Sequence, residues 1–576
     1  MRYIKKSLIV FIFLLISVFG IKLYISTRNF RGMLTSILKA SGLNVEFKNV
    51  RLIGFNTLQI EDLKVKDMAG NVVIYAKKTT AGVNLLMPTR LNRIDVYNGI
   101  VNLERRKNND FNIFHVIKKD PKKPQTYDPT SRIGKLYIHN ATVNYTDISF
   151  SKKISKTLTK VNGKLETARS RGFSIVAKGI GNKNEDGTVE ALKIELKQIL
   201  KSKQSIYSMF DKIKNSDARR KDFRLNFSFE NVGIKEELGQ YVPLEMIKAK
   251  AGILNGVLKL EHDKAKKTMQ ALGSLKIRNG KVSYVDLDGD IEGANAVIDL
   301  KKDKITVNAS TKLKESPVTF ALAYLIQDQK INLKLAADNL PFEEAARYKI
   351  IKNAKIDAQG KVTANLEVNS DIKKKKTTVD GKFSSSNIKL ANYNFQNIKT
   401  AMKIADEKLT LTNTSFVFDE TISGFKIKED VKSDKFVYDL KNKTGNGNYI
   451  LNNLGSDFSI GTITGNLKIS AKNIISGTVN SNVLNGNYTI NPSRRTLVAN
   501  ARSKGYFTVN YGGKSYTISP DVDNLVVNFN EKNMLRSGLI NAKMKDLSIP
   551  LVHSVNAHVK IHNGNYTISG TAGING

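Results

Sequence analysis

The sequence lacks cysteine and tryptophan entirely and has only 10 prolines among its 576 residues. The absence of cysteine excludes a disulfide framework, thiolate zinc sites, iron–sulfur clusters and cysteine nucleophiles. It does not identify the cellular compartment, because an exported chain can also do without cysteine. The low proline content and a hydrophobic fraction of 41% indicate folded structure. The length exceeds what one compact core holds, so we expect several domains or a repeating architecture.

Acidic residues are also scarce, with 52 Asp and Glu against 92 Lys and Arg, which gives a formal net charge of +40. Such a charge could attract nucleic acid or an anionic membrane surface. However, the basic residues are spread along the whole chain, and the longest pure run is only Lys373 to Lys376. We therefore interpret the charge as a solvated, lysine-rich surface and expect no nucleic-acid partner.

The N-terminus carries a membrane-targeting pattern. A short basic tip, residues 1–6, precedes an apolar run over residues 7–25, which is long enough to cross a bilayer as a helix. The alternative is a cleaved signal peptide, with Val18 and Gly20 as the small residues before the cut. Because the apolar run continues past those positions, we favour an uncleaved, single-pass transmembrane helix. Its N-terminus would be cytoplasmic and the bulk of the chain exported.

Residues 26–42 follow with helical periodicity. The apolar positions recur at the spacing of one helix face, and they are Phe30, Met33, Leu34, Ile37 and Leu38. This amphipathic helix could lie on the membrane surface. We prefer the interpretation that it packs against the start of the next domain.

From Asn44 onward the period changes to two, as in residues 57–67 and 318–326, which predicts antiparallel sheet with one apolar and one polar face. We expect a first β unit over 43–119, a proline-rich linker at 120–132 and a second β unit over 133–220. Leu192, Leu196 and Ile199 begin a heptad-like pattern that predicts a helix over 192–215 within this second unit. Residues 221–576 form the rest of the sheet.

Internal repeats run through the body. An apolar-x-Asn-Gly-x-apolar-x-apolar segment recurs at 96–103, 253–260, 277–284, 483–490 and 561–568, and 138–145 is the same with Ala for Gly. Gly256, Gly360 and Gly465 are separated by 104 and 105 residues, which indicates stacked repeats of about 105 residues within 221–576. Asn-Gly can form either a type I′ turn or a β-bulge, and the sequence leaves both open.

Motifs for catalysis or cofactor binding are missing. There is no His-Glu-x-x-His and no Gly-x-Ser-x-Gly, and residues 512–515 (GGKS) lack the upstream glycine of a phosphate loop. His553, His558 and His562 are spaced too far apart on a strand to share a metal. The acidic run 286–292 has neither the Gly nor the Glu that an EF-hand needs. We therefore expect no catalytic residue, no metal and no cofactor, and we do not expect an enzyme.

The first 120 residues and the repeats resemble AsmA-like and TamB-like proteins. The resemblance rests on the N-terminal anchor, the short helix and GFNTLQIEDLKVKDMAGNVVIYAKKTTAGVNLL, which begins at Gly54. It also rests on IVNLERRKNNDFNIFHVI (100–117), where Arg105 and Arg106 precede a polar turn and Phe111 and Asn112 follow it. Members of the TamB group are usually longer and end in a distinct domain, whereas this sequence reads to SGTAGING. We expect a fragment, a split gene or a short AsmA-like member.

The resemblance implies the fold and the function. The fold would be all-β: an elongated, repetitive antiparallel β-sheet curled into a taco-like groove, preceded by one N-terminal transmembrane helix. The function would be a lipid conduit in the cell envelope of a double-membrane bacterium, anchored in the inner membrane with its bulk in the periplasm. It would move phospholipids to the outer membrane. An Omp85-type outer-membrane barrel would be the partner if the chain behaves as TamB members do.

In this account an apolar stripe carries the function. In one stretch the candidate groove residues are Val282, Tyr284, Ile298, Leu300, Ile305, Val307, Phe320, Leu322, Tyr324, Ile326, Ile331, Leu333 and Leu335. Periodicity alone fits a two-sheet sandwich core equally well, and the resemblance favours the groove. Two other functions stay open: an assembly factor for outer-membrane β-barrel proteins, and a structural tether or surface β-repeat protein with a dry core.

Overall fold

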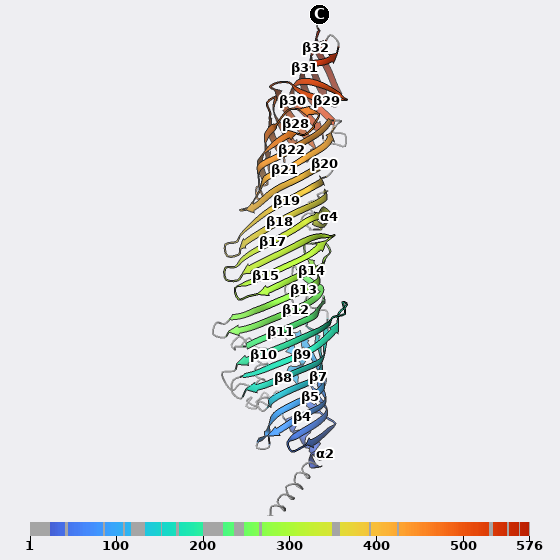
Figure 1. Ribbon diagram of the computed structural model, residues 1–576, viewed down its shortest axis with the longest axis vertical. Coiled ribbons are helices and arrows are strands. Elements are labelled where there is room, and N and C mark those ends of the chain that lie inside the picture. The colour runs from blue at the N-terminus through green and yellow to red at the C-terminus, as the bar shows by residue number, and fades with distance from the viewer. Residues whose placement is uncertain are drawn as a thin grey trace, which may run out of the picture. The chain divides into compact units, whose positions relative to one another are not determined.

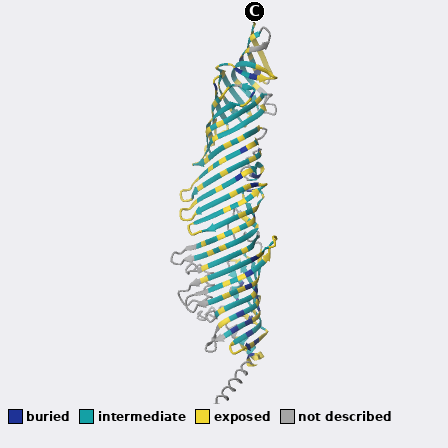
Figure 2. Cartoon of the chain, viewed as in Figure 1, coloured by how far each residue is buried: buried dark blue, intermediate teal, exposed yellow. Residues whose placement is uncertain are grey.

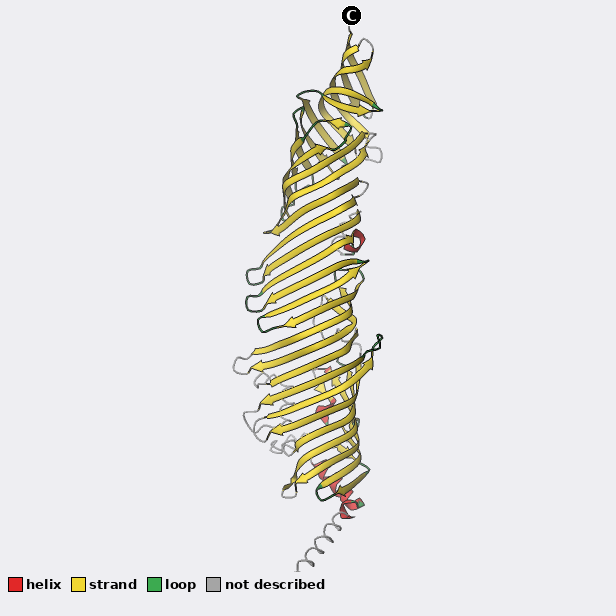
Figure 3. Ribbon diagram, in the orientation of Figure 1, coloured by secondary structure: helices red, strands yellow, loops and turns green. Residues whose placement is uncertain are grey.

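The computed structural model describes residues 23–40, 44–84, 87–107, 110–116, 133–150, 153–168, 172–199, 223–235, 247–263, 268–347, 358–390, 393–422, 425–528, 534–549, 552–563 and 565–574. The chain divides into two compact units. Unit 1 comprises 1–285 and 290–304, and unit 2 comprises 286–289 and 305–576. Strands make up nearly all of the described chain, and the helices are short (Figure 3). The predicted all-β fold is therefore confirmed.

Unit 1 is a sheet in which each strand pairs with the next along the chain. β1 and β2 both pair with β3, and the order continues β4, β5, β7 and then β8 to β14, with the short β6 beside β5 (Figure 1). The elements are α2 (Arg28–Ala40), β1 (Asn44–Glu46), β2 (Asn49–Ile53), β3 (Thr57–Lys66), β4 (Val72–Asn84), β5 (Met87–Arg106), β6 (Asp110–Phe111), η2 (Asn112–His115), β7 (Ile133–Asp147), β8 (Ile154–Ala168), β9 (Gly172–Lys183), β10 (Val189–Ile199), β11 (Phe223–Lys235), β12 (Ile247–Asp263), β13 (Thr268–Tyr284) and β14 (Asp290–Leu300).

Unit 2 repeats this arrangement. From β16 the strands pair in chain order to β33, except that β24 and β29 leave the series: β23 pairs with β25, β28 with β30, β24 with β29 and β29 with β30. The elements are β15 (Lys304–Leu313), β16 (Ser316–Leu325), β17 (Lys330–Pro341), α4 (Phe342–Ala345), β18 (Ala358–Asp371), β19 (Lys376–Leu390), β20 (Tyr393–Ala405), β21 (Lys408–Ile422), β22 (Phe425–Asp439), β23 (Thr444–Asn453), β24 (Phe458–Ser459), β25 (Ile463–Ile469), β26 (Ile475–Asn480), β27 (Leu484–Asn491), β28 (Thr496–Ser503), β29 (Phe507–Tyr511), β30 (Lys514–Asn528), β31 (Met534–Ile549), β32 (Val552–His562) and β33 (Asn565–Ile574).

Two local predictions need correction. The helix predicted over 192–215 is wrong for residues 192–199, which belong to β10, and the rest of that range lies outside the described residues. Leu192, Ile194 and Leu196 alternate with Lys193 and Glu195, and pairing with strands on both sides selects the strand period. The sheet is also not antiparallel throughout, because β5 and β7 pair in parallel. A parallel pair cannot be joined by a tight hairpin turn, and β6 and η2 lie between β5 and β7 in the chain.

The short helix predicted over 26–42 is confirmed as α2, Arg28–Ala40. Phe30 and Leu34 pack against a small core of Ile25, Val50 and Leu52. The helix thus packs against the first strands of unit 1, which is the interpretation preferred from the sequence. Among the described residues no helix is long and apolar enough to cross a membrane. The run predicted to do so lies outside them up to residue 22, as does nearly all of the linker at 120–132.

The Asn-Gly repeats have more than one structure. Register shifts mark bulges at Asn140, Asn231, Asn279, Asn339, Asn397, Asn413 and Asn524, each with φ between 45° and 53°. Asparagine tolerates this left-handed conformation better than most residues. The segments 138–145 and 277–284 therefore bend their strands, whereas Asn563 in 561–568 lies in the turn between β32 and β33. Bulges bend a strand and increase its twist, so repeated bulges curve each sheet.

The bulges are supported from the neighbouring strand. The Asn231 N–H, which leaves the ladder at the bulge, donates to the Asn255 Oδ1 at 2.9 Å, and the Asn524 N–H donates to the Asn500 Oδ1 at 2.7 Å. The Asn339 N–H donates to a threonine hydroxyl in the same way. A recurring asparagine can thus act twice in this sequence: as the bulged residue, and as the partner that satisfies the next strand's bulge.

Candidate functional site

The register of unit 2 places apolar side chains in continuous rows across the strands. One row passes through directly paired positions from β16 to β30: Leu322, Leu333, Val368, Val379, Ile404, Leu409, Tyr438, Gly445, Ile469, Ile475, Ile490, Leu497 and Val527. A second row runs beside it: Phe320, Leu335, Leu366, Gly381, Met402, Leu411, Phe436, Gly447, Leu467, Gly477, Tyr488, Ala499 and Leu525. We call these two rows the apolar face of unit 2.

Unit 1 has an equivalent surface, which we call the apolar face of unit 1. Its row is Val96, Ile138, Gly163, Ala177, Ile194, Phe227, Leu258, Gly273 and Leu300, each opposite the next. Because side chains alternate between the two faces of a strand, the intervening residues point the other way. That other face is polar, as shown in unit 2 by the Lys334–Glu367 and Lys403–Asp380 ion pairs.

These rows are not covered as a core would be. Every residue of the two unit 2 rows is half-buried, and none is fully buried; Figure 2 colours this intermediate class teal, and it predominates along the strands. In a two-sheet sandwich the inward side chains of one sheet are packed by those of the other and lose nearly all contact with solvent. In unit 2 the buried apolar residues among those described are Leu287, Ala337, Ala358, Phe507, Val509, Ala542 and Ile561. The apolar face of unit 2 is therefore mostly uncovered within the described structure.

Glycines and aromatic rings share the apolar face of unit 2. Tyr449 and Tyr488 stand opposite Gly465 and Gly477, and a methyl group at either glycine would meet the ring of the tyrosine. The Tyr449 hydroxyl donates to the Thr478 carbonyl at 2.8 Å across the next strand, and burial raises its pKa above the usual range. The two tyrosine rings therefore lie over the glycines opposite them. At these strands the glycines add no side chain of their own to the apolar surface.

Beyond the two rows, one apolar part of unit 2 is enclosed. Phe507 and Val509 on β29 are each only 7% exposed. Their position is fixed by segment 454–459, in which the Asp457 N–H donates to the Lys426 carbonyl and the Asp457 carbonyl accepts from Asn510, both at 2.8 Å. Ring contacts between Phe425, Phe458 and Tyr511 close the same region. The apolar face is thus mostly uncovered, and the enclosed part lies at β24 and β29.

The sequence-predicted stripe lies on β13 to β17 and the turn that follows β16. Phe320, Leu322 and Tyr324 stand directly opposite Leu335, Leu333 and Ile331, so these six residues are brought together. Ile298 and Leu300 lie on β14, Val282 and Tyr284 on β13, and Ile305 and Val307 on β15. All are half-exposed except Ile326, which lies in the turn after β16 and is 38% exposed. Their role in binding lipid stays a prediction.

The residues named from the sequence cover only one stretch of the surface. The rows continue from β18 to β30 with the same alternation, for instance at Val379, Ile404 and Leu411, so the signal was present in the sequence. The glycine positions in the rows gave no such signal, because a glycine shows no preference for either face. Their place could be found only from the register.

The residues that carry the family resemblance hold unit 1 together. The Arg105 guanidinium lies 2.8 Å from the Asp147 carboxylate, which is 0% exposed. The Asn112 Oδ1 accepts from the Glu104 N–H at 2.9 Å, and its Nδ2 donates to the Asn102 carbonyl at 2.8 Å. Both side chains therefore satisfy buried polar groups of β5 and β7, which is a structural role.

A group of three titratable side chains lies on the polar face of unit 1. The Arg93 guanidinium donates two hydrogen bonds to Asp95, at 2.6 and 2.7 Å, and the His139 Nε2 lies 2.8 Å from the Asp95 Oδ1. These contacts, with Arg93 the stronger, hold the pKa of Asp95 below its usual value against the effect of burial. Both carboxylate oxygens are occupied, so the group ties β5 to β7. Among the described residues no group of three or more His, Asp or Glu could hold a metal ion.

Comparison with known proteins adds no family: no family model matches this chain, and no curated protein is similar to it in sequence.

Proposed function

We propose that this protein is a lipid conduit, which moves phospholipids between the inner and outer membranes of a double-membrane bacterium along a groove formed by its apolar face. The observation that carries the proposal is that the continuous apolar rows in unit 2 are only half-buried, with no member fully buried. An apolar surface of this extent is unfavourable in water, and contiguous exposed apolar patches usually mark a binding site. Acyl chains are the ligands that match a long, featureless apolar row.

The proposed mechanism is passive. Burial of each methylene group of an acyl chain contributes about 0.8 kcal/mol, so a chain lying along the rows is held without a specific contact. Neighbouring strands present similar side chains about 4.8 Å apart. An acyl chain that moves by one strand therefore replaces its apolar contacts with equivalent ones. The headgroup stays in water at the open edge. Bending of the sheet by the asparagine bulges would give the apolar face the concave form of a groove.

The location and partners belong to the same proposal. The chain would be held in the inner membrane by residues 7–25 as a single-pass anchor, with its N-terminus in the cytoplasm and its bulk in the periplasm. An Omp85-type barrel at the outer membrane is the partner that the resemblance to TamB-like proteins implies. The tether alternative requires a dry, covered core, and the exposure of the unit 2 rows disfavours it.

The test is a matched pair of charged substitutions on β16. Leu322→Glu places a carboxylate on the apolar face, and Thr319→Glu places the same charge on the opposite face of the same strand. We expect Leu322→Glu to reduce the phospholipid that co-purifies with the full chain, measured by mass spectrometry, and to leave folding intact because the site is half-exposed. Thr319→Glu should keep wild-type lipid content.

Two results would count against the proposal. Equal lipid content in both variants would show that the apolar face does not hold lipid. Loss of folding in Leu322→Glu alone would show a dry core, because an unpaired charge buried there costs several kcal/mol. A defect confined to barrel assembly, with lipid content unchanged, would support the assembly-factor alternative.

A further inference from the structure

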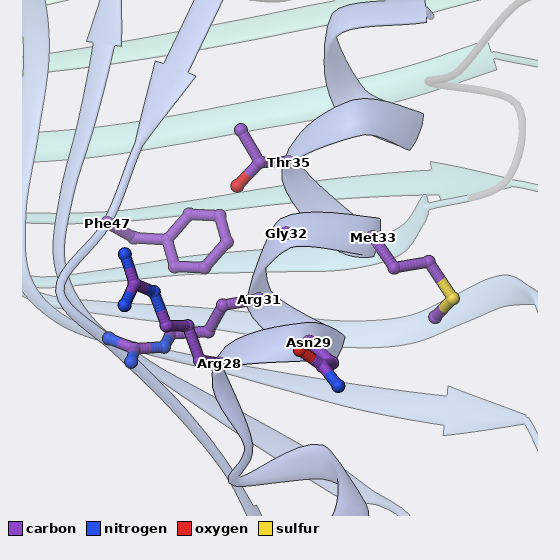
Figure 4. Close-up of a pocket in the computed structure, with 7 residues that line it drawn as sticks. All are labelled: Arg28, Asn29, Arg31, Gly32, Met33, Thr35 and Phe47. Atoms are coloured by element: carbon purple, nitrogen blue, oxygen red, sulfur yellow. The ribbon is translucent and has the colours of Figure 1, made fainter.

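A cationic hollow lies beside α2, at the end of unit 1 where its first strands begin. Its volume is about 610 Å³, within the usual range for ligand sites, and it is open to solvent. Helix α2 lines it with six residues, among them Arg28 and Arg31, and Phe47, which follows β1, lines it from the sheet side. Figure 4 shows both guanidinium groups extending from the helix toward the side occupied by the Phe47 ring, whereas Met33 points away.

The charge around this hollow is not balanced locally. The nearby carboxylates already have partners: Glu46 lies 2.6 Å from Lys66, and Glu61 lies 3.1 Å from Arg51. Within the described part of the chain, neither Arg28 nor Arg31 forms an ion pair. Two neighbouring guanidinium groups without a carboxylate attract an anion, and guanidinium matches the oxygens of a phosphate in a two-point hydrogen bond.

Arg31 is held in place without being neutralised. Its Nη1 donates to the Lys48 carbonyl at 2.6 Å, which fixes the side chain across the start of the sheet and leaves its other donors for a ligand. Helix α2 is itself fixed by Phe30 and Leu34, which pack on the Ile25, Val50 and Leu52 core. The site is therefore built on a packed helix.

The wall of the hollow is apolar on the side formed by Phe47. Phe47 packs against the same core as Leu58 and Ile60, which lie on the side of β3 that carries the apolar row of unit 1. A ligand in the hollow would thus meet two guanidinium groups with an aromatic ring beside them, and that ring packs on an apolar core. This is the amphipathic pattern of a phospholipid near its phosphate.

We propose that Arg28 and Arg31, with Phe47, bind the phosphate group of a phospholipid where the apolar face of unit 1 begins. This inference deepens the proposed function and depends on it, because the bound lipid is the one that the groove would carry. The site would select phosphate-bearing lipids over neutral ones at entry, whereas the apolar rows accept any acyl chain.

The experiment measures binding of three probes to the full chain held in a polymer belt: dihexanoyl phosphatidylglycerol, dihexanoylglycerol and inorganic phosphate. Calorimetry would compare wild type, Arg28→Gln with Arg31→Gln, and Arg28→Gln alone. The control is Arg51→Gln, which removes the same charge nearby from a residue already paired with Glu61. The single variant Arg28→Gln keeps the hydrogen bond from Arg31 to the Lys48 carbonyl, so it remains informative if the double variant misfolds.

We expect the double variant to bind the phospholipid about 10-fold more weakly, Arg28→Gln to fall between it and wild type, and the control to match wild type. Binding of dihexanoylglycerol should be unchanged in all of them. Inorganic phosphate should bind more weakly than the phospholipid, because it gains nothing from the apolar core.

Three outcomes would overturn the inference. Equal phospholipid binding in wild type and in both Arg28 variants would show that the guanidinium groups do not contact the headgroup. Inorganic phosphate binding as tightly as the phospholipid, with the same dependence on the arginines, would identify an ion site. A wild type that binds neither lipid would instead refute the proposed function itself, and that failure is distinguishable because both lipid probes are lost together.

Discussion

Glu429 places a carboxyl group on the apolar face of unit 2. It lies on β22 opposite Phe418 and Asn453, two residues from Val431, whose partners are Phe416 and Leu451. Burial raises the pKa of Glu429, and a hydrogen bond from the Ser456 Oγ opposes the shift. Ionisation of this group is therefore unfavourable in the folded chain compared with the unfolded chain.

The sign of the pH dependence follows. Because the folded chain holds the proton more tightly, stability is full below the unfolded pKa, near 4.5, and declines as pH rises through the raised folded value. We expect Glu429→Gln to raise the melting temperature relative to wild type at pH 8 and to have little effect at pH 4. The control is Asp430→Asn on the opposite face, whose carboxylate pairs with Lys432 at 2.8 Å. A lower melting temperature for Glu429→Gln at pH 8 would contradict this explanation.

The arginine and asparagine residues on which the family resemblance rests show how sequence and structure differ at this scale. The pattern Arg105, Arg106, Asn112 was visible in the sequence, but the partners that these side chains bind were not. The structure shows Asn112 hydrogen-bonded to two backbone groups of β5, and Arg105 paired with Asp147 on β7, 42 residues away. Side-chain partners of this kind depend on which strands become neighbours, and periodicity does not determine that.

At the scale of elements, the bulges are the feature most open to test. Asn524 adopts φ 45° in β30, and its N–H donates to the Asn500 Oδ1 on β28. We expect Asn500→Ala to leave that N–H without its partner, at a cost of about 1 kcal/mol. Hydrogen exchange at residue 524 should become faster, while exchange in β18 stays unchanged. Asn485→Ala is the control, since Asn485 lies on the same face of β27, opposite Arg502, and not beside Asn500. Unchanged exchange in Asn500→Ala would show that the bulge needs no such partner.

A second element-scale prediction separates the enclosed region from the open rows. Phe507 on β29 is 7% exposed, whereas Leu333 on β17 is half-exposed. Phe507→Ala should cost about 3–5 kcal/mol and loosen segment 454–459, and Leu333→Ala should cost only about 1–2 kcal/mol. Urea unfolding of the two variants provides the comparison. Equal costs would mean that Leu333 is covered as well as Phe507, and the rows would then be core.

Much of the fold at this scale could be predicted from alternation. Runs such as 318–326 and 331–337 gave strands β16 and β17, and the 3.6-residue spacing at Phe30 and Leu34 gave α2. Residues 192–199 were predicted as helix because leucines four apart fit both periods, and only the strands on either side decide between them. The parallel β5–β7 pair and the choice between turn and bulge at each Asn-Gly depend on register, which local sequence does not determine.

At the scale of the whole molecule, the sequence repeats indicated stacked β-strands, but they did not indicate whether the apolar face is covered. The spacing of Gly256, Gly360 and Gly465 indicated stacking, and in the structure all three are positions where an added methyl group would collide with the neighbouring strand's backbone. Whether a second layer covers the rows could not be predicted, because a sandwich and an open sheet have the same alternation. The difference is in exposure, and the rows of unit 2 are half-exposed.

The most direct test of an open, lipid-holding face is photocrosslinking in living cells. A photoreactive phenylalanine would replace Leu333, Leu411 or Ile490 in the rows, and Lys334, Thr410 or Thr489 on the opposite face of the same strands, in the full chain. After irradiation, mass spectrometry would detect phospholipid adducts. We predict adducts at the three row positions and few or none at the three opposite positions. Adducts absent from the row positions, or equal on both faces, would contradict the account.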